Sequence, residues 1–590
     1  MFLRRTNRHK DGKDHRYYSI VESRRVRGGR CVQKMLLYLG EINDSQKASW
    51  VRAIDVVHGR EKRQMALFPD DREIPADIDN GLRLRVSELE LRRPRQWGAC
   101  WLACVLWDML GLTEFWQGRL PASRKGTRWC RVLQTLVSYR LIDPGSEWRL
   151  HRYWYDHSAM GDLLGEDFRL AEKDTLYRCH DRLLKHKDDL FKHLRAKWGG
   201  LFEARFDVLL YDLTSTYFES DPPFEGKRRF GYSRDKRNDC VQVVIALIVT
   251  PEGFPLAYEV MAGNTQDKQT LRGMLGHIAR QYGEADRVWI MDRGIPTEEG
   301  LKEMREADAP VRYLVGTPRG HLTRYEAELS TRPWKAVHQH VRVKLLAKDN
   351  EVYILAESSR RRLKERGIRV RKLRGLLSRL AEIRSQKKID RDDLLKKIGA
   401  AEKNIGRFAR LLDVRIPAVG DPINEETFYW KLNRKKYHRM RSRDGRYLLR
   451  SNQTASDPAE LWKQYMVLTE VEEAFRNLKG DLAIRPIQHQ LESRIEAHIF
   501  IAFMAYCLHV TLRQLVRTHA PGLTPRSILD QMKAIQMIDV HIPTTDGREL
   551  KMSRYTRPDK AQQLLFTRLK LRLPPQPPPE VGTYALRARM

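Results

Sequence analysis

The sequence is poor in cysteine and lacks a long uncharged hydrophobic run. Its 7 cysteines in 590 residues are scattered and odd in number, which argues for a reducing cytosol and against a disulfide scaffold. Cys100 and Cys104 lie one helical turn apart with no second Cys or His pair at zinc-finger spacing, so we expect them in a core. The most apolar stretch, IEAHIFIAFMAYCLHVTL (495–512), contains Glu and His residues. Such a stretch is typical of a buried helix, so we expect no membrane partner.

Acidic residues are also in deficit. Lys and Arg number 109 against 76 Asp and Glu, which gives a formal net charge of +33 at pH 7, and the excess extends through most of the chain. A polyanion is the natural partner for such a protein, and nucleic acid is the commonest polyanion. The charged start, MFLRRTNRHK, is not followed by the apolar segment of a signal peptide. We therefore expect a soluble cytoplasmic protein that binds nucleic acid.

The first 200 residues have the patterns of a small β-structure and a helical region. Two strand-like runs within residues 16–43, joined by RGGR, predict a β-hairpin, and a basic helix-prone segment follows to about residue 70. From 91 to 200 the apolar residues keep helical spacing, with several Arg and Lys clusters. A basic helical region of this kind could dock on DNA, although it has no clear helix-turn-helix signature.

After residue 200 the spacing of the apolar residues changes from that of helices to that of strands. Residues 206–220, 240–250 and 254–263 have the pattern of strands, 267–282 that of a helix, and 287–296 that of a short strand. The order β-β-β-α-β predicts a mixed sheet, in which the first and fourth strands can be neighbours.

Residues 300–460 do not continue this sheet in a simple way. We expect a hairpin at 341–357 with its turn at Asp349-Asn350, and another within 428–452 with its turn at Asp444-Gly445. Between them, helical spacing of apolar residues predicts an antiparallel helical hairpin. Its apolar positions are Val370, Leu373, Leu377, Leu380, Leu394, Ile398, Ile405 and Phe408.

The last part of the chain is expected to contain two helices and an extended tail. One helix begins at about residue 457 and the apolar one covers 491–517. The proline-rich tail LPPQPPPE is expected to be extended and mobile.

Two aspartates interrupt the apolar strands of the predicted sheet. Asp212 lies between VLLY and LTSTYF, and Asp292 ends the fourth strand. Taken singly, each is more simply explained as a structural residue that caps a turn. If the first and fourth strands are neighbours, however, the two carboxylates converge and repel each other unless a cation lies between them. Hard oxygen ligands select Mg²⁺ or Mn²⁺ over zinc.

A third carboxylate would complete a site for two such ions about 3.5 to 4 Å apart, the arrangement of phosphodiester chemistry. The predicted helix YMVLTEVEEAFRNLKG (465–480) supplies Glu472, which borders the buried stripe, whereas Glu473 is expected to point more to solvent. The stripe consists of Val471, Phe475, Leu478 and Leu482. Tyr465, Glu472 and Lys479 are seven residues apart, so on one helix they lie close to one face.

This helix resembles the signature of the IS4-like DDE transposases, and within them of the IS1634-type insertion-sequence transposases. The family signature is Tyr, two residues, Arg, three residues, Glu, six residues, Lys. Tyr465, Glu472 and Lys479 match it in register. Leu468 stands at the Arg position and departs from the signature, and Arg476 on the same helix could supply the phosphate contact in its place.

The resemblance extends over most of the chain. The first two family aspartates resemble Asp212 in YDLTSTYFES and Asp292 in MDRG. Weaker similarities are IVESRR and LLYLG near the start, GYSRDKRND (231–239), GNTQD (263–267), and RPIQH with EAHIFIAF after the glutamate.

The resemblance implies an α/β fold, with an RNase H-like mixed-sheet catalytic core interrupted by a β-rich insertion that carries the helical hairpin. An N-terminal β-hairpin and a helical DNA-binding region precede the core. The expected domains are 1–90 (hairpin and basic helical segment), 91–200 (helical, DNA-binding), 201–300 (first half of the core), 301–456 (insertion), 457–520 (second half of the core) and 521–590 (C-terminal region and tail).

The implied activity is cut-and-paste transposition of an insertion sequence. Asp212, Asp292 and Glu472 would hold two Mg²⁺ or Mn²⁺ ions, and the enzyme would bind terminal inverted repeats, cut one strand by hydrolysis and join the freed 3′-hydroxyl to target DNA. The resemblance further implies a homodimer on double-stranded DNA, associated with the nucleoid of a prokaryotic host. Two alternatives stay open: a catalytically inactive DNA-binding repressor or architectural relic, and an RNase H-like nuclease without strand transfer.

Several residues are candidates for contacts with DNA, each with a simpler structural explanation. The resemblance implies phosphate contacts for Tyr465 and Lys479, and we expect others in the basic loop before the second strand and next to Asp292. Trp430 could stack on an unpaired base, although a packing role is the commoner one. The basic candidates are Arg234, Lys236, Arg237, Arg293 and Arg476. His338 and His340 would share a face of a strand, but they have no evident third metal ligand.

Overall fold

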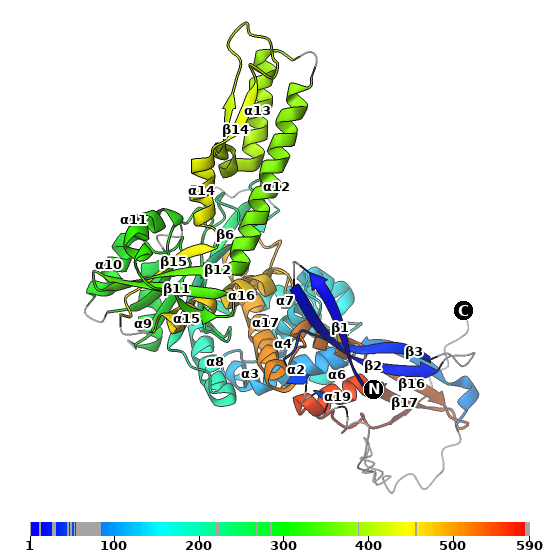
Figure 1. Ribbon diagram of the computed structural model, residues 1–590. Helices are drawn as coiled ribbons and strands as arrows, with labels where there is room; N and C mark the ends of the chain where they lie inside the picture. The colour runs from blue at the N-terminus through cyan, green and yellow to red at the C-terminus, as the bar shows by residue number, and fades with distance from the viewer. Residues whose placement is uncertain are drawn as a thin grey trace. The chain divides into compact units, whose positions relative to one another are not determined.

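The computed structural model divides into two units (Figure 1). The first comprises Met1–Phe206, Asp212–Gly283 and Thr469–Met590, and the second comprises Asp207–Tyr211 and Glu284–Leu468. The described residues are 2–10, 13–25, 31–43, 46, 47, 50, 51, 54, 84–124, 126–219, 225–266, 270–283, 286–307, 310–386, 389–454 and 457–583.

The first unit begins with a three-stranded antiparallel sheet in the order β1-β2-β3. Its strands are β1 (Phe2–Lys10), β2 (Lys13–Arg25) and β3 (Cys31–Gly40). The sequence indicated the two later strands and missed β1, which has mostly polar residues and pairs with β2 from Phe2↔Val21 to Lys10↔Lys13. Most of the basic segment expected to follow the sheet lies outside the described residues.

A helical layer built around one long apolar helix fills the middle of the first unit. The helix α17 (Glu492–His519) packs against α2, α4 and α7. It is long and apolar enough to cross a membrane, but 89% of its most apolar window is buried inside the protein, as in a core helix. The other helices here are α2 (Gly98–Met109), α3 (Leu112–Gln117), α4 (Trp129–Ile142), α5 (Glu147–Arg149), α6 (Met160–Leu164), α7 (Lys173–His180), α8 (Lys187–Phe202), α9 (Leu271–Tyr282), α16 (Thr469–Lys479), α18 (Pro525–Lys533) and α19 (Lys560–Leu569).

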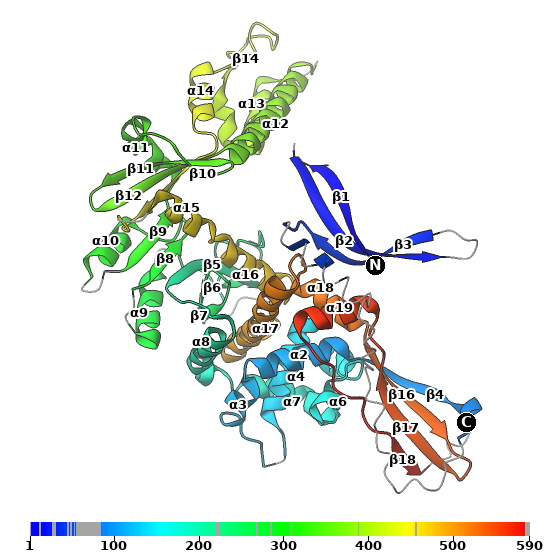
Figure 2. The same ribbon diagram turned by 60° about the horizontal axis from the view of Figure 1, so that its bottom comes forward.

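A four-stranded sheet in the order β18-β17-β16-β4 completes the first unit (Figure 2). Its strands are β4 (Glu90–Gln96), β16 (Gln536–Pro543), β17 (Arg548–Tyr555) and β18 (Glu580–Thr583). In the proline-rich segment, Gln576 accepts a hydrogen bond from the backbone N–H of Tyr555 in β17 at 3.0 Å. β18 then pairs with β17.

The largest sheet has nine strands in the order β10-β11-β12-β15-β9-β8-β5-β6-β7. Its strands are β5 (Val208–Phe218), β6 (Val241–Val249), β7 (Pro255–Ala262), β8 (Val288–Met291), β9 (Arg312–Gly316), β10 (Lys335–His338), β11 (Val341–Lys348), β12 (Glu351–Ser358) and β15 (Arg446–Ser451). The strand and helix order predicted for 206–296 is observed, with β5 and β8 adjacent and parallel. Residues 300–460, which we did not expect to continue this sheet in a simple way, contribute β9 to β12 and β15 to it.

The predicted helical hairpin is present in the second unit as α12 (Ser359–Arg384) and α13 (Arg391–Ile405), which lie side by side in both views (Figures 1 and 2). Its apolar core includes Leu373, Leu380, Leu394 and Phe408, together with Leu376, which the predicted stripe omitted. Full burial of each such side chain contributes roughly 1.5 to 3 kcal/mol. Two residues of the predicted stripe, Val370 and Leu377, are instead exposed.

The predicted hairpin at 341–357 is observed, but the one within 428–452 is not. The turn of the first, Asp349-Asn350, has positive φ at both residues, as a tight two-residue hairpin requires. In the second segment, β14 (Tyr429–Leu432) pairs with β13 (Leu412–Arg415), whereas β15 pairs with β12 and β9. The helices α10 (Glu298–Glu306), α11 (Arg319–Ser330), α14 (Arg434–Ser442) and α15 (Pro458–Met466) complete this unit.

Candidate active site

The two predicted aspartates follow paired residues of neighbouring parallel strands. The register of β5 and β8 runs from Val208↔Val288 to Tyr211↔Met291. Asp212 and Asp292 are the residues that directly follow these paired segments. They therefore occupy equivalent positions at the end of the paired segment. The Asp212 side chain is half-buried and that of Asp292 is exposed.

Tyr465 lies beside Asp292 within the second unit. Its hydroxyl donates a hydrogen bond to Oδ1 of Asp292 at 3.4 Å. Burial, and then the nearby Asp292 carboxylate, raise the pKa of Tyr465, so the phenol is protonated at neutral pH. Gly316, at the end of β9, makes room for the ring, because a Cβ at this position would lie 2.5 Å from the Tyr465 hydroxyl.

The single helix predicted to carry Tyr465, Glu472 and Lys479 is not observed. Tyr465 belongs to α15, which ends at Met466, and α16 begins at Thr469 with Glu472 and Lys479 on it. The two-residue interruption is a tight turn in which the N–H of Leu468 donates to the carbonyl of Tyr465 at 3.1 Å. The three residues therefore do not share one helix face, and the prediction of a single helix that carries all three is wrong.

Leu468, which departs from the family signature, lies in this turn. Its side chain is only 8% exposed. An arginine buried to this extent would need a carboxylate or several acceptors around it, because an unpaired buried charge is costly. Burial of the apolar side chain is therefore a physical reason for leucine at this position.

The buried stripe of α16 is largely as predicted, and it leaves Glu472 exposed. Glu472 makes no hydrogen bond or ion pair with any residue that the structure describes. The prediction for Glu473 is wrong: its side chain is half-buried and lies 3.5 Å from Arg513, which also pairs with Glu470 at 3.0 Å. Of these three glutamates, Glu472 alone is therefore left without an arginine or lysine partner in the described part of the chain.

Lys479 is held by Asp235, a residue of the GYSRDKRND segment. Its Nζ lies 2.8 Å from Oδ1 of Asp235, and both side chains are largely buried. Arg485 binds the same oxygen. Burial alone would raise the pKa of Asp235, but the hydrogen bonds from Arg485 and Lys479 outweigh it and lower that pKa. Burial lowers the pKa of Lys479, against the opposing effect of Asp235. Sequence reasoning did not single out Asp235, although its motif was noted.

The other basic candidates differ in their partners. Arg237 is paired with Asp239 and Glu219, both at 3.0 Å, and Arg476 lies 3.7 Å from Glu473 while staying 75% exposed. The backbone N–H of Arg234 donates to Ser215. Lys236 is exposed.

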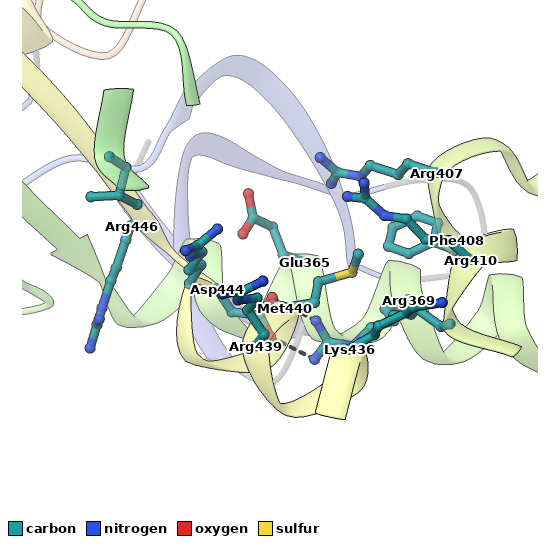
Figure 3. A pocket seen from close by; sticks show the side chains of 13 residues that line it. Glu365, Arg369, Arg407, Phe408, Arg410, Lys436, Arg439, Met440, Asp444 and Arg446 are labelled. Atoms are coloured by element: carbon teal, nitrogen blue, oxygen red, sulfur yellow. Dashed lines mark hydrogen bonds and ion pairs between the residues drawn. The ribbon is translucent and has the colours of Figure 1, made fainter. Parts of the chain in front are cut away.

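Basic side chains line cavities within the second unit. One, of about 500 Å³, is lined by Asp292, Arg293, Arg361 and Tyr465 among others. The second, of about 400 Å³, is shown in Figure 3 and has seven basic side chains in its wall. They are Arg369, Arg407, Arg410, Lys436, Arg439, Arg443 and Arg446. Concave basic surfaces of this kind suit phosphate groups.

Trp430, the candidate for base stacking, packs against the core of the helical hairpin. Its ring contacts Phe428 edge-on, with centroids 5.5 Å apart, and the Arg384 guanidinium lies 4.8 Å from its centroid. These contacts show that Trp430 has a packing role. Its ring is half-buried, and its stacking on a base stays a prediction.

Two family models match the sequence. Residues 3–66 match the IS1634 family transposase N-terminal domain, and residues 204–508, more than half of the chain, match the transposase DDE domain. The chain belongs to the IS1634-type DDE transposases. The second match begins just before β5 and ends within α17, so it includes all three predicted carboxylates of the transposase.

The transposase is also similar to solved structures, among them a cryo-EM structure of the piggyBac transposase synaptic complex with hairpin DNA. The sequence identity is 9% and the TM-score is 0.33, with 74% of this chain and 78% of the other covered. No curated protein matches the sequence. As a member of its family, the transposase is an enzyme that acts on DNA and depends on divalent metal ions.

Proposed function

We propose that this transposase cleaves DNA at the terminal inverted repeats of its insertion sequence and joins the freed 3′-hydroxyl to target DNA, using Asp212, Asp292 and Glu472. The observation that carries the proposal is the register of β5 and β8, which gives the two aspartates equivalent positions on neighbouring parallel strands. Glu472 supports it as an exposed carboxylate without an arginine or lysine partner among the described residues.

The donor set fits Mg²⁺ or Mn²⁺. All three residues are carboxylates, and hard oxygen ligands favour these ions over zinc. When bound, a pair of such ions activates the attacking oxygen and stabilises the leaving one. Asp212, Asp292 and Glu472 would hold the ions.

Other side chains would orient the carboxylates and the DNA. The Tyr465 hydroxyl, by donating to Oδ1 of Asp292, restricts that carboxylate and leaves its second oxygen available. Asp235 fixes Lys479 near the end of α16, the helix that carries Glu472. These are positioning roles, because neither Tyr465 nor Asp235 needs to touch the reacting phosphate for them.

We further propose that the sheet is the RNase H-like core implied by the resemblance. The order within the sheet is β7-β6-β5-β8-β9. Strands β5, β6 and β7, which are consecutive in the sequence, lie side by side, and β8 and β9 both run parallel to β5. The remaining strands of residues 301–456 would then extend the core sheet as well as carry the helical hairpin.

DNA would follow the basic surfaces. Arg293, Arg361 and Arg407 line one further cavity of the second unit, and such a cluster can bind successive backbone phosphates. We expect two copies of the chain to hold the two ends of the element as a homodimer. In a prokaryotic host this places the enzyme at the nucleoid.

The test is cleavage and joining of DNA that carries the ends of the element, with Mg²⁺ or Mn²⁺ added. We expect Asp212→Asn, Asp292→Asn and Glu472→Gln each to abolish both reactions while DNA binding is retained. Binding without cleavage by the wild-type chain would favour the DNA-binding relic. Cleavage without joining would favour a nuclease.

A further inference from the structure

A buried cluster of one glutamate and three histidines lies in the first unit, apart from the proposed catalytic carboxylates. Glu147 begins α5, His180 ends α7, His489 lies between α16 and α17, and His498 lies on α17. One ligand atom from each residue lies within 4.8 Å of the corresponding atoms of the other three. All four residues are more than nine-tenths buried.

The histidine nitrogens converge on one carboxylate oxygen. Oε1 of Glu147 lies 3.3 Å from Nε2 of His180, 3.5 Å from Nε2 of His489 and 3.7 Å from Nδ1 of His498. Among the described residues, none of these three nitrogens has a hydrogen-bond partner of acceptable geometry. A buried polar atom left in this state is costly, so the cluster requires an explanation.

The other ring nitrogens determine which tautomers are present. Nδ1 of His180 faces the carbonyl of Leu176 at 3.0 Å, and Nε2 of His498 faces the carbonyl of Ile484 at 3.3 Å. A carbonyl only accepts, so each of these nitrogens carries the proton of a neutral ring. In that tautomer, Nε2 of His180 and Nδ1 of His498, which face Glu147, present lone pairs. Carbonyl contacts of this kind are typical of metal-bound histidines.

A basic side chain also lies beside the cluster. Arg140 faces the cluster from α4, with its Nη2 3.9 Å from Oε1 of Glu147 and its Nη1 bound to the carbonyl of Ala483. A carboxylate among lone-pair donors is suited to a cation.

We propose that Glu147, His180, His489 and His498 bind a structural zinc ion. A tetrahedral zinc with ligands at 2.0 to 2.1 Å separates its ligand atoms by about 3.3 to 3.4 Å, close to the 3.3 to 3.7 Å found between the glutamate oxygen and the three nitrogens. Imidazole and carboxylate together suit zinc. Four protein ligands complete the tetrahedron, so the ion is structural and has no open catalytic position.

The ion would join segments that are far apart in the sequence. Glu147 and His180 belong to the helical region that precedes the mixed sheet, whereas His489 follows by ten residues the end of α16 at Lys479. Zinc would therefore brace the segment between α16 and α17 against α5 and α7. Because α16 carries Glu472, loss of the ion would loosen the support of that helix.

The experiment measures metal content and cobalt spectra of the full-length chain. We expect about one equivalent of zinc after purification and dialysis, and visible absorption bands of four-coordinate Co²⁺ when the chelator-treated chain is loaded with cobalt. Glu147→Gln, which keeps the shape and can donate a hydrogen bond to a histidine, should lose both signals, as should His489→Asn. His509→Asn should keep them, because His509 is a buried histidine of α17 outside the cluster.

Two further variants distinguish the proposed zinc ion from the proposed catalytic ions. Asp292→Asn and Glu472→Gln should keep the zinc and the cobalt bands, since carboxylates and water give six-coordinate Co²⁺ with much weaker absorption. A wild-type chain that takes up no zinc, or cobalt bands that survive Glu147→Gln and His489→Asn, would overturn the zinc site. Either result leaves the proposed catalytic triad untouched.

Discussion

Glu472→Gln is the substitution that most directly tests the proposed chemistry. Glutamine keeps the size and shape of the side chain, and Glu472 is exposed with no ion pair to a described residue. The substitution should therefore change the free energy of unfolding by less than about 0.5 kcal/mol. It removes one carboxylate charge from the proposed metal-binding set, where metal ions would contribute several kcal/mol to transition-state stabilisation. A loss of about 4 kcal/mol corresponds to roughly a thousandfold slower cleavage.

Glu473→Gln is the matched control. Glu473 neighbours Glu472 on α16, and its carboxylate lies 3.5 Å from Arg513 and 3.7 Å from Arg476. Loss of these partly exposed ion pairs should cost about 0.2 to 1 kcal/mol in stability and leave the cleavage rate within about threefold of wild type.

The assay is single-turnover cleavage of labelled DNA carrying the element's ends, with Mg²⁺, alongside chemical denaturation of each variant. Wild-type rates in Glu472→Gln, or a loss of cleavage in Glu473→Gln with Glu472→Gln active, would refute the assignment of the third carboxylate.

Three further substitutions test contacts around the site and in the second unit. Tyr465→Phe removes the hydrogen bond to Asp292 and should slow cleavage about 10- to 100-fold, as loss of such supporting contacts does, with DNA affinity unchanged in a filter-binding assay. Asp444→Asn leaves Arg369, which is 1% exposed, without its charged partner and should cost about 3 to 5 kcal/mol in urea unfolding; an unchanged midpoint would contradict this. Asp235→Asn should destabilise the chain at neutral pH. Since the folded-state pKa of Asp235 is lowered, its stabilisation is present above the unfolded value of about 3.9 and is lost as the pH falls through the folded value, so wild type and variant should converge in acid.

The local patterns were sufficient for several strands and helices. Apolar runs, one interrupted by Asp212 and the other ended by Asp292, predicted β5 and β8 as strands that can be neighbours. The register confirms that they are neighbours and shows that they are parallel. Helical spacing predicted α12 and α13 as a hairpin. In these segments the residues that form each element are close in the sequence, so the spacing of the apolar residues alone is enough to predict the element.

Other features could not be predicted because they depend on contacts between distant segments. A polar strand such as β1 is defined by its pairing partner, and β15 was assigned to a local hairpin although it pairs with β12 and β9. The residues before α16 have helical propensity, yet burial of Leu468 accompanies a turn that separates Tyr465 from Glu472. Local propensity is weak beside such tertiary packing.

The sequence by itself determined the family, the three carboxylates as candidates and the basic character of the chain, because each is a property of residue type and spacing. Only the tertiary structure decided that Tyr465 reaches Asp292 from a separate helix and that Asp235 holds Lys479. It also decided that Glu147 meets histidines of three other segments. Buried polar groups need hydrogen-bond or ionic partners, and these partners come from distant segments that only the fold brings together. The local spacing of residue types in the sequence does not contain this information.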